Sequence, residues 1–132
     1  MHGRQAAPTV YCQGQELKKV NTVFGTVMFL ICGDLFEDDL VAQVRNLQPD
    51  WLPFPFARCF DDLSYDQVRW DREEKFRYIE RVKIARTTTF MVNELADKEL
   101  NGGFGGAIAI SATGEIIGSV PIGKEGILYV EV

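Results

Sequence analysis

One cysteine stands at the point where a long apolar run gives way to an acidic segment. Residues 24–31 read FGTVMFLI, and Cys32, Gly33 and Asp34 follow directly. A strand-to-helix turn of this kind can hold a thiol exposed, with backbone N–H groups beside it. Cys32 is therefore the candidate nucleophile. The alternative is that Cys32 is a small buried core residue, which is a common fate of a lone cysteine.

The residues available to activate this thiol exclude the best-known arrangements. A thiol nucleophile needs a general base or a lowered pKa, and the usual base is histidine. The chain has one histidine, His2, next to the N-terminus, so a papain-like or caspase-like Cys-His pair is not expected. A base for Cys32 would have to be a carboxylate or a lysine.

Cysteine usage indicates reduced thiols. Cys12, Cys32 and Cys59 are odd in number and form no C-x-x-C pair, which disfavours a disulfide framework. A metal site is not expected either, because zinc usually needs more histidine or cysteine ligands than the chain offers. The glycine-rich stretch 102–106 lacks the lysine of a phosphate-binding loop, so no cofactor is predicted. A redox-sensing Cys32 is a third possibility, disfavoured because no resolving cysteine lies near it in sequence.

Length, composition and charge indicate one soluble domain. The chain has 132 residues, of which 46% are hydrophobic and 25% charged; we expect residues 1–10 to be flexible and 11–132 to form the domain. The net charge of −5 argues against a nucleic-acid partner. No apolar run approaches the roughly 20 residues of a membrane span, and no signal peptide is evident, so a cytoplasmic location is expected.

The order of apolar and polar segments predicts an α/β domain. Two helices are predicted, at residues 37–47 and 65–86. Strands are predicted before, between and after them, at residues 18–22, 24–32, 51–56, 87–92, 106–111, 115–121 and 127–132. A β-α-β-α-β order followed by an antiparallel meander is typical of a layered α/β fold.

Three local features refine these elements. The apolar composition of residues 24–32 predicts a strand buried on both faces. Pro53 and Pro55 point to the end of strand 51–56, to an edge position or to a bulge, since proline cannot donate to a sheet ladder. Ser64 and Gln67 have the spacing of a capping box at the start of the second helix.

Short motifs run in order through nearly the whole chain. They are Tyr11-x-x-Gly14, Thr22-x-Phe24-Gly25, Leu30-Ile31-Cys32-Gly33-Asp34, Gln48-Pro49-Asp50-Trp51-Leu52-Pro53, residues 81–86, Phe104-Gly105-Gly106-Ala107, residues 113–117 and residues 125–132. In this order they resemble the C-terminal half of the carbon–nitrogen hydrolase family, the nitrilase and aliphatic amidase superfamily. Three positions depart from the family pattern: Gly33 replaces an aromatic residue, Arg86-Thr87 replaces Glu-Asn, and Ala107 replaces serine.

The resemblance implies a fold and a mechanism. The family fold is a four-layer α-β-β-α sandwich, and this chain would supply part of it: a mixed sheet with helices on one face. The family mechanism uses a Glu-Lys-Cys triad and a thioester intermediate, in which Cys32 would be the nucleophile and the Gly33 N–H would stabilise the oxyanion. The family's glutamate and lysine lie upstream of the motif that begins at Tyr11, and residues 1–10 contain neither.

These inferences lead to two alternative functions. The first is a hydrolase that acts on a small amide or nitrile, incomplete as this chain, with Asp34 and Phe56 near the substrate pocket and a homo-oligomer or a complementing N-terminal half as partner. For Asp34 the competing role is that of a helix cap, and for Phe56 it is core packing. The second function is a catalytically inactive α/β interaction module, because half a sandwich exposes one face of its sheet.

Overall fold

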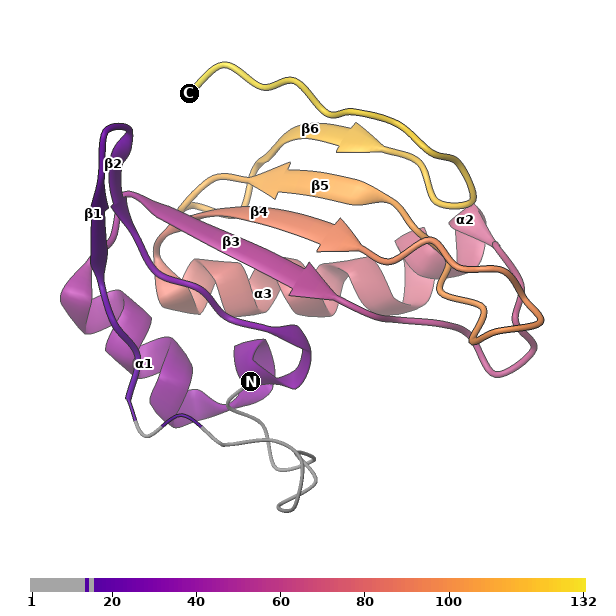
Figure 1. Cartoon of the computed structure of the whole chain (residues 1–132), viewed down its shortest axis with the longest axis horizontal. Coiled ribbons are helices and arrows are strands. Elements are labelled where there is room, and N and C mark those ends of the chain that lie inside the picture. Colours follow the sequence, from indigo (N-terminus) through magenta and orange to yellow (C-terminus); the bar gives the residue numbers. More distant parts are fainter. Residues whose placement is uncertain (1–13, 15) are drawn as a thin grey trace.

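The computed structural model describes residue 14 and residues 16–132, and within them one six-stranded sheet with helices on one face (Figure 1). The strands are β1 (Val20–Thr22), β2 (Gly25–Val27), β3 (Trp51–Phe56), β4 (Thr88–Asn93), β5 (Ala107–Ile110) and β6 (Ile116–Val120). The helices are α1 (Asp38–Leu47), α2 (Gln67–Arg69) and α3 (Lys75–Ala85), with a 3₁₀ turn η1 (Cys32–Phe36) and a π-helical turn η2 (Trp70–Glu74). The expected segment 1–10, together with His2 and Cys12, lies outside the described residues.

The sheet follows the chain in the order β1-β2-β3-β4-β5-β6. β1 and β2 form an antiparallel hairpin, β2, β3 and β4 run parallel, and β4, β5 and β6 form an antiparallel meander. Parallel neighbours need crossover connections, and α1 and α3 supply them on the same face of the sheet (Figure 1). The predicted α/β class, the mixed sheet and the helices on one face are confirmed.

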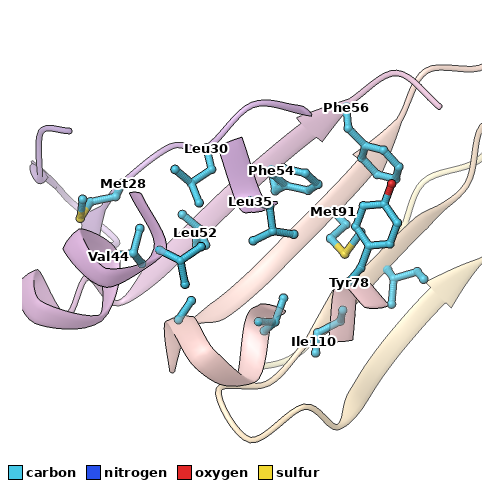
Figure 2. Packing of buried hydrophobic residues seen from close by; sticks show 14 of the residues in the cluster. Met28, Leu30, Leu35, Val44, Leu52, Phe54, Phe56, Tyr78, Met91 and Ile110 are labelled. Carbon is cyan, nitrogen blue, oxygen red and sulfur yellow. The ribbon is translucent and has the colours of Figure 1, made fainter. Parts of the chain in front are cut away.

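The core lies between this face and the two crossover helices. Alternate residues of β3, namely Leu52, Phe54 and Phe56, point to the helices because side chains alternate along a strand. α1 contributes Val41 and Val44 to the same cluster. Figure 2 shows how these apolar side chains meet Leu30, Leu35, Met91 and Tyr78 under the sheet.

The strand predicted at residues 24–32 is shorter and more exposed than expected. β2 covers three residues. Phe24 is 83% exposed and Phe29 is 51% exposed, so the prediction of a strand buried on both faces was wrong. The physical reason is pairing: β2 joins β3 through the single pair Val27↔Trp51, after which the chain runs extended to Cys32.

Of the alternatives for strand 51–56, the edge position is wrong, and the bounds of the strand are confirmed. β3 lies inside the sheet, with β4 paired along all six of its residues. β2 pairs with β3 only at Trp51. Along the rest of β3, the edge that faces β2 therefore needs no backbone N–H to donate to a neighbouring strand. Pro53 and Pro55 are tolerated there for this reason.

Two further predictions need correction. The helix expected at residues 65–86 is confirmed as one continuous helical run over residues 67–85, in which α2, η2 and α3 follow one another without a break. Its N-cap is Asp66, whose side chain accepts a hydrogen bond from the Arg69 N–H at 3.0 Å. The Ser64 capping box is therefore not formed. The segment expected as a final strand, residues 127–132, joins no ladder; Leu128 and Val130 instead lie against Gly118 of β6.

The opposite face of the sheet is apolar and largely uncovered by helices. On β3, β4 and β5 this face carries no charged side chain; its residues are Trp51, Pro53, Pro55, Thr88, Phe90, Val92, Ala107 and Ala109, of which Ala109 is fully buried. Trp51 and Phe90 pack with ring centroids 5.8 Å apart, and Val92 is 56% exposed. Among the described residues, none of the helices has the length and apolar character needed to cross a membrane.

Candidate functional site

Cys32 is the first residue of η1, and its side chain is exposed. Its φ angle is +52°, in the left-handed region that side chains other than glycine rarely occupy. The conformation costs about 1–2 kcal/mol relative to the right-handed region. A strained backbone at an exposed thiol is the geometry expected of a nucleophile held on a turn, so the buried-core alternative is excluded.

The turn is fastened from beneath by Asp34. Its carboxylate Oδ2 accepts a hydrogen bond from the Ile31 N–H at 3.0 Å, and its own N–H donates to the Ile31 carbonyl at 3.0 Å. Asp34 is fully buried, which places it behind the turn and gives it a positional role. It does not cap the following helix: the N-cap residue of α1 is Glu37.

Gly33 lies in the first turn of η1, where backbone amides have no partner within the helix. A Cβ atom built on Gly33 would meet no heavy atom within 4 Å outside its two chain neighbours, so this position has open space on its Cβ side. The described residues contain no cluster of three or more His, Cys, Asp or Glu that could hold a metal ion.

Helix α3 holds the nucleophile turn in place from the other side. Arg81 donates from Nε to the Leu35 carbonyl at 2.8 Å and forms an ion pair with Asp38 at 2.9 Å. Phe36, the last residue of η1, meets Tyr78 edge to face with ring centroids 5.1 Å apart. The turn is thus fixed to α3 by a hydrogen bond and an aromatic contact, and the ion pair joins α3 to the first residue of α1.

An ion pair lies at the end of β3, beside Tyr78. Arg58 donates to Glu74 from Nε at 2.9 Å and from Nη2 at 2.6 Å, and this bidentate contact raises the pKa of the Arg58 guanidinium. The buried Asn93 fixes the Arg58 backbone: its Oδ1 accepts from the Arg58 N–H at 2.8 Å, and its Nδ2 donates to the Arg58 carbonyl at 3.1 Å. Sequence reasoning missed this group, because its members are 16 to 35 residues apart.

The structure brings Cys32, Gly33 and Asp34 together in one turn but places Phe56 apart from them. Phe56 faces the helices and contacts Tyr78, with ring centroids 5.3 Å apart (Figure 2). It lines a pocket of about 240 Å³ to which Cys32 does not contribute. Phe56 and the nucleophile turn are linked through Tyr78.

Replacing Cys32 by glycine is expected to stabilise the fold. Glycine adopts positive φ without the steric cost, and its greater unfolded-state entropy offsets part of the gain, leaving about 0.5–1 kcal/mol. Urea denaturation measures the difference. The control is Cys32→Ala, which keeps a Cβ and should change the free energy of unfolding by less than about 0.5 kcal/mol. A loss of stability in Cys32→Gly would show that the turn is not strained.

Tyr78 should make the stability of the fold depend on pH in alkali. Burial, with a smaller contribution from the charge of Glu74, raises the pKa of Tyr78 to about 12 from an ordinary value of 10.0. The folded state therefore favours the protonated phenol, so this stabilisation is complete below pH 10 and is lost as the pH rises through 12. Across this pH range the free energy of unfolding should fall less steeply with rising pH in Tyr78→Phe than in the unchanged chain. The control Tyr129→Phe, at an 85% exposed position, should match the unchanged chain.

Comparisons with known proteins agree on the fold. No family model matches the sequence, and no curated protein matches it. Among solved structures, glutamine-dependent NAD+ synthetase from Acinetobacter baumannii superposes with a TM-score of 0.71 at 18% identity, over 88% of this chain and 21% of that one. Saccharomyces cerevisiae Nit3, of branch 10 of the nitrilase superfamily, gives a TM-score of 0.69 at 14% identity, over 89% and 41%.

An amidase from Nesterenkonia sp. gives a TM-score of 0.62 at 15% identity, over 85% of this chain and 40% of that one. At such identities the likeness concerns the fold, and the chain spans less than half the length of each of these three proteins. The described residues therefore have the fold of part of a nitrilase-superfamily carbon–nitrogen hydrolase domain.

Proposed function

We propose that this chain supplies the nucleophile of a carbon–nitrogen hydrolase that cleaves a small amide or nitrile through Cys32. The observation that carries the proposal is the exposed, left-handed Cys32 at the start of η1 in a fold shared with amidases of the nitrilase superfamily. A strained backbone at an exposed thiol lowers the stability of the fold. Strain of this kind is found at active sites, where it holds a nucleophile in position.

For an amide, the proposed reaction has two stages. A general base takes the thiol proton, the Cys32 sulfur bonds to the carbonyl carbon, and the oxygen becomes an anion that accepts a hydrogen bond from the Gly33 N–H. The C–N bond then breaks, and the base returns the proton to the leaving ammonia or amine. In the second stage water adds to the thioester, releasing the acid and restoring the thiol.

Other residues of the chain position these groups. Asp34 fixes the turn from behind through the Ile31 N–H, and Arg81 fixes it from α3. We assign Asp34 a supporting role at the substrate site rather than contact with substrate, since it has no exposed surface. Phe56 would bound the site indirectly, through Tyr78 and Phe36.

The base and the lysine of the mechanism would come from a segment that packs on the open face of the sheet. That face is apolar and uncharged on β3, β4 and β5, and the chain spans no more than 41% of the three solved proteins compared above. A complementing N-terminal half would bury this face and bring a Glu and a Lys to Cys32. A homo-oligomer could bury the same face, but it would bring only residues of this same chain to Cys32.

The test is to recover the protein with its companions from its own cells through a C-terminal epitope tag. We expect the recovered assembly to release ammonia from small amides. Fluoroacetamide is a suitable probe, because an amidase from Nesterenkonia sp. AN1 was captured with the acetamide moiety of fluoroacetamide on its active-site cysteine. We expect the same adduct on Cys32, with an S–C bond formed and fluoride released, and none on Cys59.

An assembly that neither releases ammonia nor forms the adduct would overturn the enzymatic proposal. It would favour the second candidate, a non-catalytic interaction module, which the open apolar face supports. The two candidates differ in a second measurement. Val92→Lys on the open face should disrupt the assembly in both cases, whereas Cys32→Ala should leave assembly intact and remove only catalysis.

A further inference from the structure

The cavity lined by Phe56 lies between the helices and the β5–β6 hairpin, and Cys32 is not among its lining residues. It measures about 240 Å³. Its walls come from α2, η2 and the first residue of α3 on one side, and from β5 and β6 on the other. Ligand sites for drug-sized molecules measure roughly 300–1,000 Å³, so this cavity is suited to a smaller molecule.

The floor of the cavity is apolar and built from core residues. Trp70, Met91 and Ile108 line it and are 3%, 1% and 7% exposed, and Ile122 closes it at 8%. A floor of this composition favours an aliphatic or aromatic group over a polar one. It holds no donor or acceptor apart from the backbone and the Trp70 indole.

The mouth of the cavity carries one negative and one positive side chain. Asp71 and Lys75, one helical turn apart, form an ion pair with Oδ1 and Nζ 2.5 Å apart. Hydrogen bonding from Lys75 lowers the pKa of Asp71, so this carboxylate is ionised at neutral pH. Gln67 joins the mouth to the segment that follows β6, because it donates to Asp71 at 3.1 Å and accepts from the Ile122 N–H at 2.9 Å.

The local helix geometry is unusual at this mouth. Residues Trp70–Glu74 form a π-helical turn, in which the Lys75 N–H bonds to the Trp70 carbonyl. Such turns are rare in proteins and occur frequently at functional sites. The turn contributes Trp70 to the floor and Asp71 to the mouth.

We propose that this cavity binds a small zwitterion with an apolar side chain, of the chemical class of an aliphatic or aromatic α-amino acid. The apolar side chain would fill the floor over Trp70. The ammonium group would pair with Asp71 and the carboxylate with Lys75, so each charge of the resident ion pair would gain a partner of opposite sign. Cys32 does not line the cavity, and amino-acid binding there does not depend on the hydrolase proposal.

Titration of the chain with L-leucine tests the proposal, with two-dimensional NMR as the readout. We expect saturable shifts of the Trp70 indole N–H and of the Ser119 amide, both of which belong to cavity-lining residues. Two analogues that each keep one charge, 3-methylbutylamine and 4-methylpentanoic acid, should bind at least about 10-fold more weakly, which corresponds to 1.4 kcal/mol. Equal binding of either analogue would overturn the zwitterion assignment.

Variants separate the site from a general surface effect. Asp71→Asn and Lys75→Met should each weaken L-leucine binding about 10-fold, because each removes one charge partner. The matched control is Lys83→Met, which breaks the exposed Glu80–Lys83 pair on α3, outside the cavity. It should bind like the unchanged chain. Absence of saturable shifts with L-leucine and with L-phenylalanine, in a chain that unfolds cooperatively, would refute the site.

Discussion

Replacing Cys32 by alanine is expected to lower amide hydrolysis by the recovered assembly at least about 10³-fold, since the substitution removes the atom that bonds to substrate. The side chain is exposed and makes no core contact, so the variant should fold and assemble normally. Ammonia release under saturating substrate measures the effect, and circular dichroism and sedimentation verify the fold and the assembly.

The matched control is Cys59→Ala. Cys59 is half-buried and lies three residues after the end of β3. It plays no part in the proposed chemistry. Hydrolysis should remain within about twofold of the unchanged assembly. Retention of more than a tenth of the activity in Cys32→Ala would mean that another group performs the attack.

Replacing Phe54 by alanine is expected to lower the free energy of unfolding by about 3–5 kcal/mol, the range for large aromatic residues in packed cores. Phe54 is completely buried at the centre of β3, stacked on Phe56 with ring centroids 5.3 Å apart. The surrounding cluster is held by two helices and three strands, so it should collapse only partly into the space left behind. For a domain of ordinary stability, this loss is a large share of the total.

Urea denaturation of the isolated chain provides the measurement, and Val92→Ala provides the control. Val92 belongs to the neighbouring strand but points to the open face and is 56% exposed. Its truncation should cost less than about 1 kcal/mol in the isolated chain. Similar losses for the two variants would contradict the assignment of core face and open face.

Local patterns predicted those parts of the fold that local forces determine. The spacing of Val41 and Val44 and the acids before them located α1 to within one residue. The break from apolar to acidic residues located the turn at Cys32, because a chain leaving a sheet for a helix must turn there. The bounds of β3 followed from the short apolar run at residues 51–56.

Features that depend on contacts distant in sequence could not be predicted in the same way. The interior place of β3 depends on how far β2 pairs with it, and no property of Pro53 or Pro55 reveals that length. The Arg58–Glu74 ion pair and the hydrogen bond from the Arg58 N–H to Asn93 join three segments that are distant in sequence. The φ angle of Cys32 is likewise invisible in the sequence, since glycine is the residue type that usually marks a left-handed position.

The two edges of the sheet have a consequence for the size of any assembly. β1 is only three residues long and follows Lys18 and Lys19, and β6 carries a register shift against β5. Short, charged or irregular edges resist the addition of further strands. Association through the open face, by contrast, ends once two layers have met. For the proposed association through the open face, we therefore expect closed particles of fixed stoichiometry rather than growing filaments.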